Sequence, residues 1–358
     1  MNFENKEDMK FYKGHIVGIF SVMFSSIILV FFLSWTGLKD LNKKNGFIRT
    51  ISRNVVRISN VVKREEYILD FAGNTNASIF FKTKDPGVIV VRDYNLNLKK
   101  LIKINLPNNK AISSAFHTII DSPKIEILAC NAKLVVKSNF SESSSVIYNI
   151  PSKAFSRVAK ISDDVYIFRG FDSTKPGEQS LTKRNTLSGD LKRENNILEL
   201  RHDAGLSTDG FLHYDKKSNQ LVYVYIYTNK IVSFDTNLNV VYKKNTIDTL
   251  NTFQTTAGLI SDDSKGVYSN LTPKRIINYQ SCIYNGNIYN LSKLKSDNES
   301  ADDYLNNSII DVYAVSNGNY LFSFYLPNYK NEHVLQFHFL NEKRIICLYK
   351  SYIAEYTF

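Results

Sequence analysis

The chain has 358 residues, of which 43% are hydrophobic, and this composition excludes an intrinsically disordered protein. Its 22 Tyr and 23 Phe, beside abundant Ile and Val and little Ala, favour β-sheet over helix. The net charge of +11 would suit a polyanion, but the Lys and Arg residues are spread along the chain without a recognition helix, a zinc finger or an RNP motif. We therefore expect no nucleic-acid partner.

The first element is an apolar segment near the N-terminus. Residues 14–38 contain no Lys, Arg, Asp or Glu, and a helix that rises about 1.5 Å per residue crosses a hydrocarbon core of ~30 Å over this length. We expect a transmembrane helix there, after a short N-terminal tail at 1–13 and before a polar linker at 39–46. The run exceeds the core of a cleaved signal peptide and no small-residue cleavage motif follows it, so we expect a retained anchor.

The charges around this segment and the layout of the chain favour opposite membrane orientations. More Lys and Arg follow the segment than precede it, which by the positive-inside rule favours a cytoplasmic C-terminal domain. Long domains, however, translocate largely regardless of charge, and a short tail ahead of a large β domain is the usual layout of a signal anchor. We expect a single-pass protein of the cell membrane whose C-terminal domain is extracytoplasmic, in the periplasm.

Residues 47–358 read as short apolar strands separated by turn signals, without a long stretch of helical periodicity. The clearest unit is residues 211–244, in which four strands follow one another: FLHYD, QLVYVYIY, KIVSFD and VVYKK. Four consecutive antiparallel strands form one blade of a β-propeller. Similar units recur at 67–107, 114–151, 156–200, 279–327 and 334–358.

The sequence therefore predicts an all-β fold, a six-bladed β-propeller, after one N-terminal transmembrane helix. The last unit has only three strands, and we expect residues 47–59 to return as its fourth strand, which closes the ring and removes an exposed edge. The long interval at 248–270 is either an insertion or a degenerate seventh blade.

These units resemble the six-bladed propellers of the NHL and TolB-like kind, and the whole chain resembles uncharacterised membrane-anchored propellers of Bacteroidetes-type bacteria. The resemblance covers residues 47–358 and consists in the rhythm of the strands, without a WD, kelch or YWTD signature. It implies the fold and a central funnel, and it implies no particular activity.

Polar side chains recur at one position of the first strand in each unit. When the six first strands are aligned on their apolar flanks, this position holds Asp70, His117, Lys160, His213, Cys282 and His338. Because the innermost strands of a propeller surround its channel, we expect these residues to form a ligand-binding ring. Hydrogen bonding to channel water or to neighbouring backbone is their alternative role.

Three members of this predicted ring are histidines. His117, His213 and His338 are the candidate ligands for a divalent transition metal such as zinc, the one cofactor that the sequence suggests. A wide channel could hold the three rings too far apart for bonds of about 2.1 Å.

The sequence contains no complete catalytic set, because it lacks a nucleophile elbow and a glycine-rich phosphate loop. We assign no catalytic residue and expect a non-enzymatic binding or interaction module of the bacterial cell envelope, tethered to the membrane, with a protein, peptide or glycan as partner. The alternative is a metal-assisted hydrolase or lactonase-like propeller enzyme that uses the His, Asp and Cys side chains of the ring.

Overall fold

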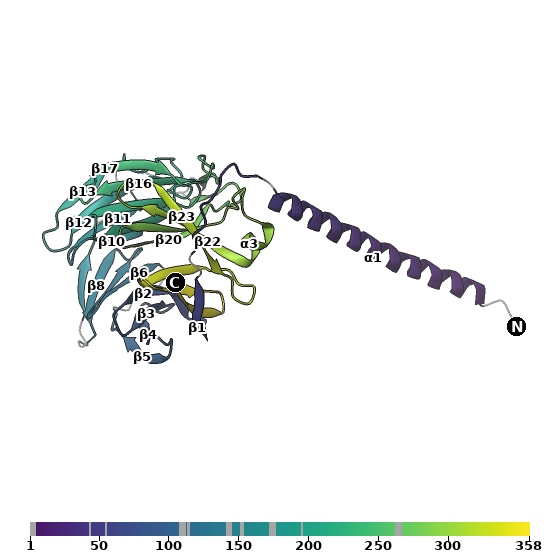
Figure 1. Cartoon of the computed structure of the whole chain (residues 1–358), viewed down its shortest axis with the longest axis horizontal. Helices are drawn as coiled ribbons and strands as arrows, with labels where there is room; N and C mark the ends of the chain where they lie inside the picture. Colours follow the sequence, from purple (N-terminus) through teal and green to yellow (C-terminus); the bar gives the residue numbers. More distant parts are fainter. Residues whose placement is uncertain are drawn as a thin grey trace. The chain divides into compact units, whose positions relative to one another are not determined.

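The chain folds as two compact units, Met1–Asn45 and Gly46–Phe358. The first is helical and the second is built of β-sheet (Figure 1). The structure, a computed structural model, describes residues 5–42, 44–53, 56–106, 112, 115–140, 145–150, 154–171, 177–194, 196–261 and 267–358.

Helix α1, Asn5–Asn42, makes up most of the first unit. Its stretch His15–Ser34 has a mean hydropathy of 2.7, and the protein buries none of it. By length and composition this stretch is able to cross a membrane. Ser25 and Ser26 donate their hydroxyl hydrogens to carbonyl oxygens one turn earlier, so that these polar groups are satisfied within the helix itself.

Helix α1 extends beyond both ends of the expected segment 14–38. Part of the expected tail at 1–13 and part of the expected linker at 39–46 are therefore helical, while residues 1–4 and 43 lie outside the described part of the chain. The apolar run shows where lipid can surround the helix, but it does not limit the helix, because good helix formers lie on both sides of it: Lys, Glu and Met before it, and Lys and Leu after it.

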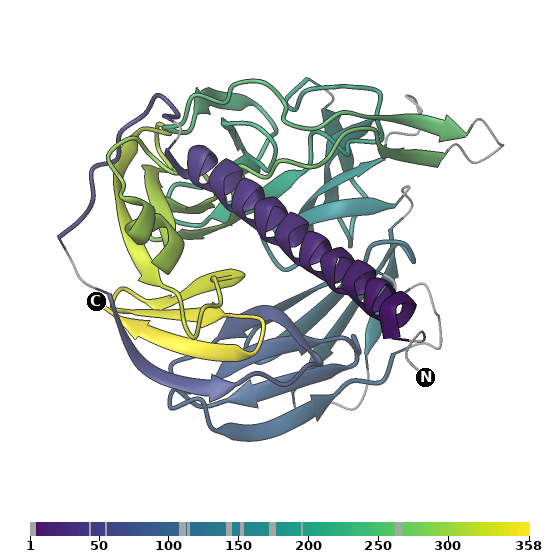
Figure 2. The ribbon, with the colours of Figure 1, turned by 90° about the vertical axis from the view of Figure 1, so that its right-hand side faces the viewer.

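The second unit consists of six four-stranded antiparallel sheets arranged around a central axis, and a separate two-stranded hairpin (Figure 2). The predicted six-bladed β-propeller is confirmed. Blades 1 to 3 are β2 (Ile68–Asn74), β3 (Ile79–Thr83), β4 (Val88–Arg92) and β5 (Leu98–Lys103); β6 (Phe116–Asp121), β7 (Lys124–Ala129), β8 (Leu134–Asn139) and β9 (Val146–Asn149); and β10 (Phe155–Lys160), β11 (Val165–Phe171), β12 (Gln179–Asn185) and β13 (Leu191–Glu194).

Blades 4 to 6 continue the pattern, with the short helix α3 (Ala301–Asn306) inserted in blade 5. Their strands are β14 (Gly210–Asp215), β15 (Gln220–Tyr225), β16 (Lys230–Asp235) and β17 (Val240–Asn245); β20 (Asn278–Tyr284), β21 (Asn287–Ser292), β22 (Asn307–Ala314) and β23 (Tyr320–Pro327); and β24 (Gln336–Asn341), β25 (Arg344–Leu348), β26 (Tyr352–Thr357) and β1 (Arg57–Lys63).

The second strands of the blades carry the densest part of the core. Strand β15 reads QLVYVY and buries its last five side chains in succession, where a half-exposed strand would alternate. This pattern arises because a blade packs against a neighbour on each face, so that neither face of its inner strands meets water. Apolar clusters accordingly join blades, as where Tyr289 of blade 5 and Phe339 of blade 6 lie with their ring centroids 4.1 Å apart.

The long interval at 248–270 is an insertion between blades 4 and 5. It holds the hairpin of β18 (Ala257–Ser261) and β19 (Val267–Asn270), which pair with each other and with no other described strand. The tip at 262–266 lies outside the described residues. The alternative of a seventh blade is therefore wrong, because a two-stranded hairpin cannot span from the axis to the rim of a propeller.

Strand β1 completes blade 6 by pairing with β26 in antiparallel register. The segment expected to do so, 47–59, overlaps β1 only at its end, and residues 54–55 lie outside the described part. The earlier residues contact blade 5 instead, where Ile51 forms a parallel bridge to Ser323 on the outer strand β23. The closing strand thus lies further along the chain than its apolar pattern suggested.

Arg49 explains this difference, because its side chain is buried in blade 5. Its Nε donates to Asp311 Oδ1 at 2.7 Å, and its Nη1 forms an ion pair with Glu299. The same guanidinium donates to the Ser292 hydroxyl and to the Leu294 carbonyl, each at 2.9 Å. Two carboxylates and two neutral acceptors therefore surround the buried charge and fasten the segment before β1 to its neighbouring blade.

We expect Arg49→Met to destabilise the propeller by about 3–5 kcal/mol, because it leaves Glu299 and Asp311 buried without their cation. Urea unfolding of the propeller unit followed by circular dichroism measures this loss. The matched control is Arg57→Met at an exposed position of β1, for which we expect a change within about 0.5 kcal/mol. Equal stabilities of the two variants would contradict the role given to Arg49.

Candidate functional site

The first strands of the blades surround the central axis. Strand β2 contacts β6 and β24, β14 contacts β10 and β20, and β20 contacts β24. Four of the six predicted ring residues, Asp70, His117, His213 and His338, make contacts between neighbouring inner strands. These four side chains therefore lie between neighbouring inner strands, as hydrogen-bonding or charged groups.

Asp70 and His338 connect β2 of blade 1 with β24 of blade 6. Their closest atoms, Oδ1 and Nε2, lie 3.6 Å apart. The His338 ring also stacks on Phe71, with ring centroids 4.5 Å apart. This pair sits at the join between the first and last blades, where the two ends of the propeller chain meet.

His117 and His213 make the equivalent connections between other blades. His117 Nε2 lies 3.1 Å from the carbonyl oxygen of Ser156, and His213 Nε2 lies 2.8 Å from the hydroxyl oxygen of Ser281. Burial lowers the pKa of His117 to about 4 and that of His213 to about 3, with further lowering by nearby positive groups. Both rings are therefore neutral at pH 7 and act as hydrogen-bonding groups between inner strands.

The other two predicted ring residues lie elsewhere. On β20 the partner of His213 is Ser281, while Cys282, one residue further along, belongs to the apolar cluster between blades 5 and 6. On β10 the partner of His117 is Ser156, while Lys160 lies at the far end of that strand. For Cys282, alignment on apolar flanks failed because a shift of one residue along a strand turns the side chain to the opposite face. For Lys160 it failed because the alignment placed the residue at the far end of the strand, four residues from Ser156.

Within the residues that the structure describes, no three side chains of His, Cys, Asp or Glu lie close enough together to hold a metal ion. His117, His213 and His338 each contact a different partner strand. Among the described side chains, the geometry thus offers no site for the transition metal that the sequence suggested.

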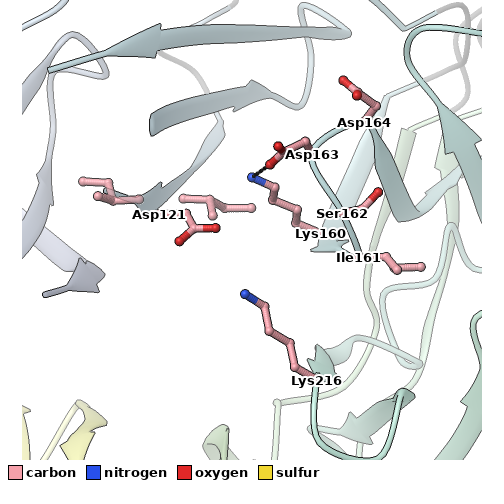
Figure 3. A pocket seen from close by; sticks show the side chains of 9 residues that line it. Asp121, Lys160, Ile161, Ser162, Asp163, Asp164 and Lys216 are labelled. Atoms are coloured by element: carbon pink, nitrogen blue, oxygen red, sulfur yellow. Dashed lines mark ion pairs between the residues drawn. The ribbon is translucent and has the colours of Figure 1, made fainter. Parts of the chain in front are cut away.

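Lys160 instead lines a cavity of about 590 Å³ at the ends of the first strands of blades 2, 3 and 4 (Figure 3). These strand ends lie side by side because every first strand of a propeller runs in the same direction along the axis. The lining residues are Ile119, Ile120 and Asp121 from β6, Lys160 from β10 with the following turn Ile161, Ser162, Asp163 and Asp164, and Lys216 from the turn after β14.

Three of the charged groups around the cavity have ion-pair partners. Lys160 Nζ lies 2.8 Å from Glu126 Oε1, and Lys137 Nζ lies 2.6 Å from Asp164 Oδ1. Lys160 pairs with Glu126 and Asp163, Asp163 also pairs with Lys124, and Asp164 pairs with Lys137 (Figure 3). The hydrogen bond from Lys124 lowers the pKa of the Asp163 carboxyl, which keeps this partner charged.

Asp121 and Lys216 differ from these three groups. Both side chains are exposed, and neither makes a hydrogen bond or ion pair with another residue of the described part of the chain. Figure 3 shows Lys216 extending into the open space from one side, with Asp121 on another. The cavity therefore presents to solvent one carboxylate and one ammonium that have no hydrogen bond or ion pair among the described residues, and the charge of Asp121 also acts on Lys124 at longer range.

The floor of the cavity is apolar. Ile119 and Ile161 are half-buried, Ile120 is buried, and no aromatic side chain is among the lining residues. The sequence carries a signal for this site, since charged residues lie at the end of the first strand in three successive blades: IIDSPK, AKISDD and HYDKKS. That signal becomes a site only when the blades stand next to one another.

Comparison with known proteins supports the fold and nothing finer. No family model and no curated protein matches the chain. A solved structure of a DUF4221-family member from Bacteroides vulgatus is similar, with a TM-score of 0.51 and 12% identity over 88% of this chain and 98% of that one. A streptogramin B lyase follows with a TM-score of 0.46 and 12% identity, over 85% of this chain and 97% of the lyase.

The topology and the Bacteroides structure together define the class of this protein, a six-bladed β-propeller with an apolar N-terminal helix. The resemblance inferred from the rhythm of the strands is thereby confirmed at the level of the fold. At 12% identity, the activity of neither protein can be assigned to this chain.

We expect acid to destabilise the propeller partly through His213. Its folded-state pKa is depressed to about 3 from an ordinary 6.5, so the unfolded chain binds more protons between these values and stability falls as the pH drops below 6.5. His213→Gln keeps a hydrogen-bonding group but cannot titrate, so its free energy of unfolding should fall less steeply, by up to about 1.4 kcal/mol per pH unit. Urea unfolding at several pH values measures both slopes, and identical slopes would contradict the assignment.

Proposed function

We propose that the protein is a membrane-tethered binding module of the bacterial cell envelope, and that its ligand site is the cavity at the first-strand ends of blades 2 to 4. The supporting observation is the pair of unpartnered charges, Asp121 and Lys216, that line this cavity above an apolar floor. A volume of about 590 Å³ falls within the range of small-molecule sites, about 300–1,000 Å³.

The tether in this proposal is helix α1, with its apolar stretch His15–Ser34. The chain joins the propeller soon after the helix, since the Gly46 N–H donates to Asp297 and Phe47 packs with Ile277 and Leu294. We place the propeller on the extracytoplasmic side, in keeping with the layout of a signal anchor.

The attachment point and the cavity lie at opposite ends of the strands. Ile277 precedes a first strand and Leu294 follows a second strand, whereas Asp121 and Lys216 lie where first strands end. All first strands run in the same direction, so the two features belong to opposite faces of the propeller. In the proposed function, a ligand reaches the cavity from the face opposite the attachment point.

The metal-assisted hydrolase that the sequence also allowed lacks a comparable observation. Its candidate ligands His117, His213 and His338 are dispersed over three inter-strand contacts in the described structure. We therefore propose binding, without a catalytic step.

We expect the full-length protein to remain in the membrane pellet after extraction with alkaline carbonate, and a variant without residues 15–34 to be released, because the apolar stretch alone holds it in lipid. Protease added to spheroplasts should degrade the propeller from outside. Release of the full-length protein by carbonate would contradict the tether, and protection of the propeller from external protease would contradict the orientation.

We expect Ser162→Trp to abolish ligand binding, because Ser162 is exposed at the cavity wall and an indole there fills the space. A ligand at 100 times its Kd raises the free energy of unfolding by about 2.7 kcal/mol. Thermal unfolding with and without the small-molecule fraction of a cell extract measures this stabilisation.

The control for this experiment is Lys343→Trp, at an exposed position in the equivalent turn of blade 6. We expect the wild type and Lys343→Trp to be stabilised by the extract and Ser162→Trp to be unaffected by it. Equal stabilisation of all three proteins would show that the ligand binds elsewhere, and no stabilisation of the wild type would argue against the proposed function.

A further inference from the structure

We infer that the cavity takes a small dipolar ligand with an apolar body, of the chemical class of a short free peptide, with its ammonium at Asp121 and its carboxylate at Lys216. This inference rests on the proposed function, which it makes more specific. It is carried by the balance of charge around the cavity and by the chemistry of its floor.

The charges around the cavity leave one negative and one positive group without a partner. Lys160, Asp163 and Asp164 are already neutralised by ion pairs with residues of blades 2 and 3. Asp121 and Lys216 make no hydrogen bond or ion pair with the described residues. A ligand that carries both an ammonium and a carboxylate would form an ion pair with each of these two groups.

Ligands of a single charge fit the cavity less well. A phosphate or another simple anion would meet Lys216, but the unpaired carboxylate of Asp121 beside the same space would repel it. A simple cation would meet Asp121, but Lys216 would repel it. A dipolar ligand avoids both repulsions when its charges are oriented toward the opposite groups.

The two unpaired charges come from different blades. Asp121 ends β6 in blade 2, Lys216 follows β14 in blade 4, and the turn that begins at Ile161 lies in blade 3 between them. Figure 3 shows Asp121 and Lys216 on separate sides of the open space. A ligand that meets both groups therefore bridges blades 2 and 4.

The floor of the cavity distinguishes a peptide from a sugar. Ile119 and Ile161 offer aliphatic surface, and no aromatic side chain is among the lining residues on which a sugar ring could stack. Aliphatic side chains of a peptide gain free energy when they are buried against this surface. A dipeptide of two leucines has the apolar body. At pH 7 its termini are an ammonium and a carboxylate, which would pair with Asp121 and Lys216.

The test is isothermal titration calorimetry of the full chain in detergent micelles with leucyl-leucine as the probe. We expect leucyl-leucine to bind, and Asp121→Asn and Lys216→Met each to weaken its binding about fivefold, as expected for one partly exposed ion pair. The control is Lys217→Met in the same turn, where Nζ lies 3.1 Å from Asn285 Oδ1 outside the cavity, and its affinity should equal that of the wild type.

Modified probes test which end of the peptide meets which residue. N-acetyl-leucyl-leucine lacks the ammonium, so it should bind the wild type and Asp121→Asn equally. Leucyl-leucine amide lacks the carboxylate, so it should bind the wild type and Lys216→Met equally. A purely structural effect of either substitution would weaken all three probes alike, and this outcome would overturn the inference.

Two failures can be told apart by thermal unfolding with the cell extract. If leucyl-leucine does not bind but the extract stabilises the wild type and not Ser162→Trp, the peptide assignment is wrong and the proposed function stands. If neither the dipeptide nor the extract binds, both are wrong. Binding of leucyl-leucine that neither Asp121→Asn nor Lys216→Met changes would also overturn the peptide assignment.

Discussion

The pairing of β1 with β26 is the constraint on which the rest of the propeller depends. A propeller is a ring of blades that bury their faces against each other, and in this chain the ring is completed by a strand from the beginning of the unit that joins a blade from its end. Arg49 adds a buried, fully paired charge just before that strand and ties the closing segment to blade 5. Without this closure, the apolar surface between blades 1 and 6 would face water and blade 6 would lose its outer strand.

The candidate site is a consequence of the closed ring. Asp121, Lys160 and Lys216 are separated along the chain by whole blades and converge because their strands end at the same level of the ring. The contact of His117 with Ser156 joins the inner strands of blades 2 and 3, which form two sides of the cavity. A binding site made from turns on such a frame needs little ordering when a ligand arrives, which favours affinity for small molecules.

The four-strand rhythm, the number of blades and the apolar helix could be predicted from the sequence, because strand length, turn residues and hydropathy are local properties. What could not be predicted depends on contacts between blades. Cys282 was assigned to the channel although Ser281 takes that place, since a strand with apolar residues on both faces does not reveal which face turns inward. The closing strand was expected too near the N-terminus. Nothing in the sequence around Arg49 shows that this residue pairs with two carboxylates of blade 5. The unpaired state of Asp121 and Lys216 is likewise a property of three assembled blades.

Hydrogen exchange of the amides in β26 tests the closure of the ring most directly. Two versions of the propeller are compared, one that begins at residue 46 and one that begins at residue 64 and so lacks β1. Closure predicts that β26 is slowly exchanging in the first and exchanges fast in the second, with blade 6 opening before the other blades. Equal protection of β26 in both versions would contradict the ring closure, and with it the basis for the shared register of the six blades.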